Sequence, residues 1–189
     1  MKFYGKTLRF KRGITLQISL LYPCNLACEY CTLDMPTGKR PISKQSTLED
    51  WKFYIKNFPV KIKEVFVSGG EPTMIKWLPE LLEWLLAEKY HVTVFTNLFN
   101  PKMLKVKPNF RYQIIATYHH SDNQERFDKA YKELEGYRVD VQEIGSKKLP
   151  YSKVIPFTNN EELQSKLFRV SPDLQLYTSC YEHYYNKSR

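Results

Sequence analysis

Three cysteines lie close together near the start of the chain, in the run Pro-Cys-Asn-Leu-Ala-Cys-Glu-Tyr-Cys. They are Cys24, Cys28 and Cys31, and they follow an apolar stretch over residues 14–22. Closely spaced thiolates are the ligands that iron-sulfur clusters use in proteins. When three cysteines hold a cluster in place of the usual four, one iron keeps an open coordination site where a substrate or cofactor can react. The spacing therefore predicts a reactive cluster.

A zinc site is an alternative use of the same thiols. Cys28 and Cys31, together with Cys180 and His183, have the CxxC and CxxH spacings of zinc ligands. Most of the chain separates the two pairs, whereas compact zinc modules keep their ligands closer in sequence. This set also leaves Cys24 without a role. The corresponding hypothesis is a zinc-stabilised, basic module that binds nucleic acid.

A second motif, Gly-Gly-Glu-Pro, occupies residues 69–72. Two glycines before a proline can form an ordinary tight turn. Here they follow a β-branched run that we expect to form a strand, and at such a place glycines let the backbone approach a bound group closely. Backbone carbonyls and a carboxylate can also receive an ammonium group. The position of the motif therefore favours ligand binding.

Apolar, β-branched runs alternate with helical patterns along the chain, which predicts βα units around a parallel sheet of five or six strands. The expected strands cover residues 14–22, 64–68, 91–96, 111–118, 138–144 and, more weakly, 153–157; the expected helices cover 47–58, 78–89, 123–134 and about 160–168. Reactive groups in such folds gather at the carboxyl ends of the strands. Both motifs, Thr96-Asn97 and residues 117–120 lie at such ends.

The two motifs together, with an aromatic residue before the last cysteine, resemble the radical SAM superfamily. The resemblance covers about residues 14–145. It implies an α/β fold, a partial, open (βα)6 TIM-like barrel with parallel strands. We expect one domain over residues 1–189, with a core over about 14–168, a short basic N-terminal arm and a C-terminal tail that the pattern does not assign.

The resemblance also implies two cofactors. Cys24, Cys28 and Cys31 would hold a 4Fe-4S cluster, and S-adenosylmethionine would chelate its fourth iron. The residues that the resemblance assigns to S-adenosylmethionine are Tyr30, Gly69, Gly70, Glu71, Thr96, Asn97 and Thr117. Reduction of the sulfonium by an electron from a donor such as flavodoxin or ferredoxin would give a 5'-deoxyadenosyl radical, which takes hydrogen from a substrate. Such a protein is oxygen-sensitive.

The substrate side of the site has no motif of its own. Cys180 is a candidate hydrogen-atom donor, with a buried bystander thiol as the alternative. His119 and His120 are candidates to act on substrate protons, with a structural role as the alternative. The expected substrate is a bulky peptide, nucleotide or partner protein. Within the family, a deazaguanine-pathway enzyme and an activase of glycyl-radical enzymes both remain open.

Composition adds two expectations. The formal net charge of +9 and the 15% aromatic content could serve a nucleic-acid partner, although scattered lysines explain much of the charge.

No run approaches the roughly 18 apolar residues of a membrane span, and the first residues do not resemble a secretory signal. Three of the four cysteines lie together, which is a poor disulfide framework. We therefore expect a cytoplasmic protein without a membrane partner.

Overall fold

The fold is described from a computed structural model, over residues 2–3, 6–7, 13–28, 31, 45–144, 149–155 and 168–177. Its main feature is an eight-stranded sheet in the order β10-β9-β3-β4-β5-β6-β7-β8. Six of these strands were expected from the sequence: β3 Ile14–Ser19, β4 Ile62–Ser68, β5 His91–Thr96, β6 Tyr112–Tyr118, β7 Val139–Ile144 and β8 Lys153–Ile155. Each runs parallel to the next. The predicted α/β fold with six parallel strands is confirmed.

Two further strands extend the sheet beyond β3. β9 (Phe168–Val170) pairs parallel with β3, and β10 (Leu176–Tyr177) pairs antiparallel with β9. The predicted helix over 160–168 is therefore wrong at Phe168, which begins a strand; residues 160–167 lie outside the described part. A three-residue strand is too short for alternation to identify it. β1 (Lys2–Phe3) and β2 (Lys6–Thr7) form a separate antiparallel pair.

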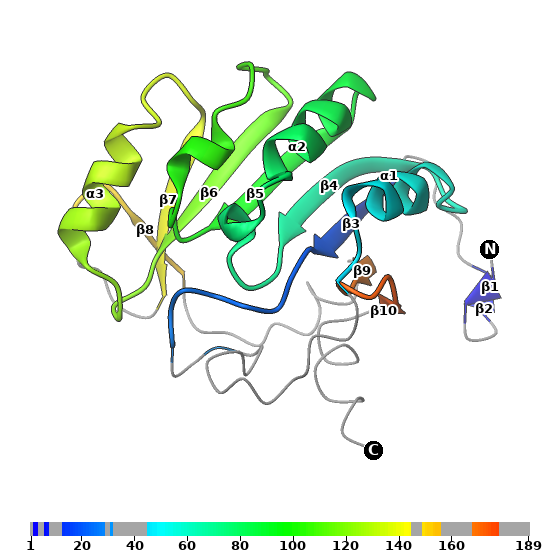
Figure 1. Ribbon diagram of the computed structural model, residues 1–189, viewed down its shortest axis with the longest axis horizontal. Coiled ribbons are helices and arrows are strands. Elements are labelled where there is room, and N and C mark those ends of the chain that lie inside the picture. The colour runs from blue at the N-terminus through cyan, green and yellow to red at the C-terminus, as the bar shows by residue number, and fades with distance from the viewer. Residues whose placement is uncertain are drawn as a thin grey trace.

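Three α-helices cover one side of the parallel sheet (Figure 1). They are α1 (Leu48–Lys56), α2 (Leu78–Ala87) and α3 (Gln124–Lys132), with short 3-10 turns at η2 (Pro72–Met74) and η3 (Pro101–Leu104). Thr47 and Asp50 form a capping box at the start of α1: the Thr47 hydroxyl accepts from the Asp50 backbone nitrogen, and the Asp50 carboxylate accepts from the Thr47 backbone nitrogen.

The two faces of the sheet differ in chemistry. Residues that point toward the helices are apolar and fully buried, among them Leu16, Ile18, Val65, Val67, Val92, Val94 and Ile114. Side chains alternate between faces along a strand, so Gln17, Ser68 and Thr117 belong to the opposite face. That face is polar over much of its length. It is the face on which a ligand could be received.

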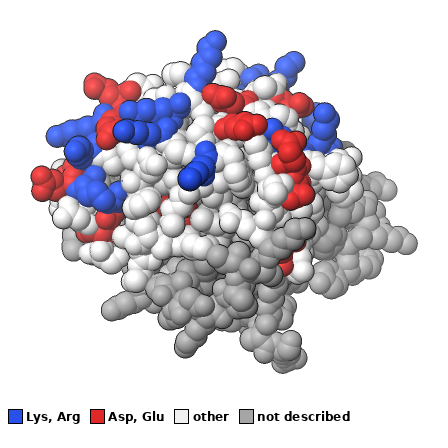
Figure 2. Space-filling view, viewed as in Figure 1, with Lys and Arg blue, Asp and Glu red and all other residues white. Residues whose placement is uncertain are grey.

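Charge is mixed on the surface that Figure 2 draws, where lysine and arginine side chains are interspersed with acidic ones. The described residues on this face form no uniformly basic area of the kind that nucleic-acid binding uses. Within the described part of the chain, no helix combines the length and the apolar character that crossing a membrane requires.

Candidate active site

A cavity of about 330 Å³ opens at the carboxyl ends of the strands. Segments far apart in the sequence contribute to its walls, which combine residues of the loops after β3, β4, β5 and β6 with strand residues from the polar face of the sheet. The lining residues are Gln17, Cys24, Leu26, Cys28, Cys31, Ser68, Gly69, Gly70, Glu71, Phe95, Thr96, Asn97, Thr117, His119, Ile144 and Arg169. The fold therefore brings together both predicted motifs and the ends of β5 and β6.

The three cysteines of the first motif are all free thiols that line this cavity. Cys28 is buried, and Cys24 and Cys31 are partly buried. Burial raises the pKa of the Cys24 thiol to about 11, and the backbone hydrogen bond from Leu26 opposes that shift only in part. Cys24 is therefore protonated at neutral pH unless a metal centre stabilises its thiolate.

The donor set fits an iron-sulfur cluster. Three thiols surround one cavity, and thiolates are the soft ligands that such clusters select. Within the described residues, no three His, Cys, Asp or Glu side chains are arranged to hold a single metal ion. Two members of the alternative zinc set, Cys180 and His183, lie outside the described part of the chain.

The two glycines of the second motif pack against the cysteine loop. A Cβ atom on Gly70 would lie 1.8 Å from the Pro23 carbonyl oxygen, and one on Gly69 would lie 2.4 Å from that of Leu21. Gly69 also has a φ of +128°, which side chains rarely adopt. The Gly70 nitrogen donates to the Leu21 carbonyl at 2.8 Å. Gly69 and Gly70 also line the cavity, and the close approach of their backbone to a bound group stays a prediction.

Glu71 is buried, and its carboxylate accepts hydrogen bonds from neighbouring protein groups. Oε1 accepts from the Thr73 backbone nitrogen, the Thr73 hydroxyl and the Thr96 hydroxyl, and Oε2 accepts from the Asn97 backbone nitrogen. Burial raises the pKa of Glu71, while these donors oppose the shift. The carboxylate thus ties the loop after β4 to the end of β5. Direct contact between Glu71 and a ligand stays a prediction.

The predicted residues at the ends of β5 and β6 lie close to the cysteines. The Asn97 amide nitrogen is 2.9 Å from the Asn25 Oδ1 and 3.7 Å from the Cys24 sulfur. Thr117 lines the cavity, and its hydroxyl accepts a hydrogen bond from the Gln142 amide at 2.8 Å. Tyr30, which the family resemblance assigned to S-adenosylmethionine, lies outside the described residues.

The two histidines after β6 have different surroundings. His119 lines the cavity, and its Nδ1 lies 3.4 Å from the Cys28 sulfur. Burial lowers its pKa to about 4, with Asp122 opposing the shift and His120 adding to it. His120 instead lies 3.4 Å from the buried carboxylate of Glu143. Only His119 is therefore placed beside a predicted cluster ligand.

Sequence reasoning missed two arginines that shape the site. Arg126 on α3 donates to the backbone oxygens of Asn97 and Leu98 at 2.8 and 2.7 Å. Arg169 on β9 lines the cavity and donates to the Gln17 Oε1 at 2.6 Å. Gln17 could have indicated the polar face of the sheet from the sequence, because it is a polar residue between two buried apolar residues of a strand. The arginines carry no such local signal.

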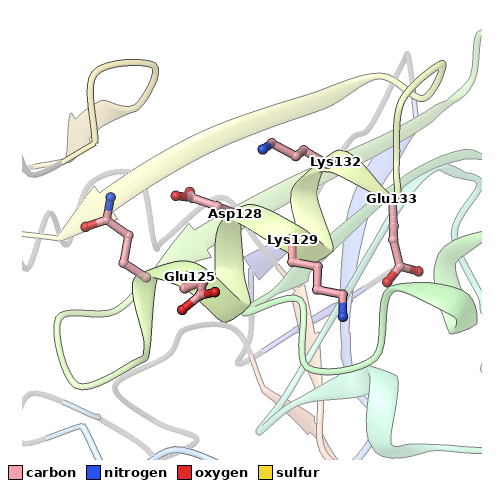
Figure 3. Close-up of a pocket in the computed structure, with 6 residues that line it drawn as sticks. Glu125, Asp128, Lys129, Lys132 and Glu133 are labelled. Carbon is pink, nitrogen blue, oxygen red and sulfur yellow. The ribbon is translucent and has the colours of Figure 1, made fainter.

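A second depression lies over the exposed side of α3, among Gln124, Glu125, Asp128, Lys129, Lys132 and Glu133 (Figure 3). Its side chains carry both charges and come from α3 and its C-cap residue. It contains none of the predicted site residues, and we assign no function to it.

Three free thiols surround a cavity at the carboxyl ends of the parallel strands. In an α/β fold, this arrangement is typical of a cofactor-dependent enzyme. The sequence profile described as the Radical SAM superfamily matches residues 18–144. This match covers more than half of the chain, and the chain belongs to that superfamily. Membership implies a 4Fe-4S cluster and S-adenosylmethionine as cofactors.

Two curated relatives come from Aquifex aeolicus. A GTP 3',8-cyclase is 28% identical over 162 residues, which cover 78% of this chain and 50% of that protein. A 7-carboxy-7-deazaguanine synthase is 34% identical over 77 residues, covering 41% of this chain and 33% of that protein. The chain thus spans half or less of the length of these relatives.

Solved structures of Streptococcus suis SuiB share the fold. The structure bound to S-adenosylmethionine has a TM-score of 0.58 at 12% identity, over 92% of this chain and 62% of that one. The structure bound to the precursor peptide SuiA has a TM-score of 0.53 at 20% identity, over 72% of this chain and 34% of that one. The likeness supports a TIM-like partial barrel.

Proposed function

We propose that the chain catalyses hydrogen abstraction from a polar substrate by radical SAM chemistry. The observation that carries the proposal is the convergence of Cys24, Cys28 and Cys31 with the Gly-Gly-Glu-Pro loop around one cavity. When bound, the cluster supplies the electron that cleaves S-adenosylmethionine to methionine and a 5'-deoxyadenosyl radical. The chain's own residues bind the two cofactors, orient them and exclude water.

The proposed division of roles follows the cavity walls. The three cysteines ligate the cluster. The backbone of Gly69 and Gly70 and the end of β5 receive the methionine portion of S-adenosylmethionine, with Glu71 fixing the loop from behind. Thr117 lies on the β6 wall, where it faces the same cavity.

A polar substrate is proposed because the sheet face behind the cavity is polar. Gln17, Thr117 and Arg169 supply polar groups to the cavity, and Phe95, Leu26 and Ile144 add apolar surface among the described lining residues. The relatives' names support a nucleotide, since one acts on GTP. The SuiB complex supports a peptide as the second candidate. A bulky substrate, a one-electron donor such as flavodoxin or ferredoxin and a reducing, cytoplasmic location belong to the same proposal.

The test is anaerobic. The protein is reconstituted with iron and sulfide, reduced with dithionite and given S-adenosylmethionine, and 5'-deoxyadenosine is measured. We expect a 4Fe-4S spectrum and 5'-deoxyadenosine from the unmodified protein and from Cys180→Ala, but neither from Cys28→Ala. GTP and peptide panels are then screened for faster 5'-deoxyadenosine formation and for hydrogen transfer from deuterated substrate.

The matched cysteine variants separate this proposal from the zinc module. A zinc site built on Cys28, Cys31, Cys180 and His183 predicts a colourless protein that loses its metal in Cys180→Ala as well as in Cys28→Ala. It also predicts nucleic-acid binding that weakens steeply as salt rises. Tightly bound zinc without any 5'-deoxyadenosine would overturn the enzyme proposal.

A further inference from the structure

The turn after β6 presents two polar side chains to one predicted cluster ligand. The Cys28 sulfur lies 3.4 Å from the Nδ1 of His119 and 3.5 Å from the Oγ of Ser121. A hydrogen bond from the Asp122 nitrogen to the His119 carbonyl closes this turn at 2.8 Å. Both side chains are therefore carried by one short, internally bonded segment.

The direction of these contacts is fixed once Cys28 ligates iron. A free thiol can donate or accept, but a thiolate bound to iron has no proton and can only accept. The Nδ1 of His119 and the hydroxyl of Ser121 must then both be donors. His119 is thereby committed to the tautomer that carries its proton on Nδ1.

The donors around Cys24 are of a different kind. The Cys24 sulfur is 3.5 Å from the backbone nitrogen of Leu26 and 3.7 Å from the amide nitrogen of Asn97. Cys24 has one contact within the cysteine loop, at Leu26, and one from the end of β5, at Asn97, whereas both contacts of Cys28 come from the turn after β6. The surroundings of Cys28 can therefore be altered by substitutions outside the cysteine motif.

We propose that His119 and Ser121 donate hydrogen bonds to the Cys28 thiolate and so raise the reduction potential of the cluster. Hydrogen bonds to ligand sulfurs are among the factors that set the potential of iron-sulfur clusters. The reduced cluster carries one more negative charge than the oxidised cluster, so the same donors stabilise it more. His119 then acts on the cluster, and it is not the residue that exchanges protons with substrate.

This inference rests on the proposed function, because it requires a cluster on Cys28. It is tested on the reconstituted 189-residue chain without S-adenosylmethionine, by redox titration followed by electron paramagnetic resonance. His119→Leu removes the donor, whereas in His119→Asn the amide nitrogen takes the place of Nδ1. Ser121→Ala removes the second donor. His91→Leu, at the amino end of β5, is the matched control.

We expect the Leu variant to reduce the ratio of reduced to oxidised cluster at a fixed potential by roughly tenfold, which corresponds to about 59 mV for one electron. Ser121→Ala should shift the potential in the same direction by less, and the double variant by more than either alone. His119→Asn should recover much of the loss, and His91→Leu should match the unmodified protein. Unchanged potentials in fully loaded His119→Leu and in the double variant would overturn the inference.

A second measurement uses the unmodified protein, so that the inference can be tested even when a variant binds the cluster incompletely. Protein labelled with 15N-histidine is reduced, and pulsed electron paramagnetic resonance is used to detect coupling between the cluster spin and a histidine nitrogen. The inference expects a weak coupling that His120→Asn retains. A reduced cluster without any such coupling would contradict it. If no cluster forms in the unmodified protein, the proposed function itself fails.

Discussion

The backbone nitrogen of Asn97 donates a hydrogen bond to the Glu71 Oε2 at 2.7 Å. This bond joins the loop after β4 to the residue that follows β5, and Asn97 in turn contacts Asn25 and Cys24. These contacts therefore connect the Gly-Gly-Glu-Pro motif to the cysteine motif. The glutamate of Gly-Gly-Glu-Pro acts on the cysteine loop through a neighbouring strand.

The first prediction concerns Glu71→Gln. Two of the groups that Glu71 accepts from are backbone N–H donors, at Thr73 and Asn97. A glutamine amide can accept from only one side, so one N–H would face another donor. We expect the free energy of unfolding of the cluster-free protein to fall by about 1–3 kcal/mol. Urea denaturation measures the loss.

The control for this variant is Glu83→Gln on the exposed side of α2. A surface substitution of this kind should change the free energy of unfolding by less than about 0.5 kcal/mol. Equal midpoints for the two variants would show that the Glu71 carboxylate does not hold the loop.

The second prediction compares two glycines. In Gly70→Ala the new Cβ would lie 1.8 Å from the Pro23 carbonyl oxygen, so the loop that carries the cysteines must move. Gly136→Ala also changes a glycine, with a φ of +87°, but its Cβ would meet no atom within 4 Å. We expect Gly136→Ala to cost about 1–2 kcal/mol through backbone strain alone. Gly70→Ala should cost more and bind less iron after reconstitution.

Iron content and urea denaturation of both alanine variants decide this comparison. Full iron loading of Gly70→Ala, with stability equal to that of Gly136→Ala, would mean that the motif does not set the position of the cysteine loop.

The strands and helices were largely predictable because each has a strong local signal. β5 spans residues 91–96 as expected, and α1 begins after the Thr47 cap. β9 escaped prediction because three residues carry no period, and its pairing with β3 is a contact between distant parts of the chain. Local pattern specifies an element, but the edge to which a short strand adds depends on tertiary packing.

The sequence predicted the cluster ligands of the candidate site better than it predicted the residues that hold the surrounding loops in position. The spacing of the cysteines identified them, whereas the role of Glu71 depends on donors 25 and 26 positions away, at Thr96 and Asn97. His119 was a candidate to act on substrate protons, with a structural role as the alternative, and its contact with Cys28 depends on the turn after β6. Arg126 reaches the same region from α3. Such contacts arise only when strand ends converge, so no single segment encodes them.

The third prediction concerns Arg126→Lys. The guanidinium donates to two backbone oxygens, at Asn97 and Leu98, and pairs with Asp122. A lysine ammonium cannot reproduce this forked geometry. We expect a loss of about 1–3 kcal/mol in the free energy of unfolding. Hydrogen exchange at residues 97–99 should become faster.

Arg111→Lys, which changes a side chain stacked on Phe110, is the control for Arg126. It should leave exchange at residues 97–99 unaltered. If both lysine variants exchange at the wild-type rate, Arg126 does not restrain the loop.

The fourth prediction is a dependence on pH. Burial raises the pKa of Tyr112 well above its ordinary value of 10.0, and its hydroxyl donates to the Leu104 carbonyl at 3.1 Å. The pKa of Tyr112 is higher in the folded than in the unfolded protein. The contribution of Tyr112 to the free energy of unfolding is therefore complete below pH 10, and it declines as the pH rises toward the folded-state pKa. Compared with Tyr112→Phe, the unmodified protein should lose about 1.4 kcal/mol more per pH unit above pH 10. Parallel pH profiles would contradict this.

The last prediction concerns the wall of the cavity at β6. Thr117 lines the cavity, and its hydroxyl accepts from the Gln142 amide at 2.8 Å. Thr117→Val keeps the shape but removes the hydroxyl, whereas Thr117→Ser keeps the hydroxyl. If Thr117 contacts S-adenosylmethionine, the valine variant should bind it roughly tenfold more weakly, a difference of about 1.4 kcal/mol. Calorimetry on reconstituted protein measures both affinities. Equal affinities for the serine and valine variants would remove Thr117 from the cofactor site and leave it as a partner of Gln142.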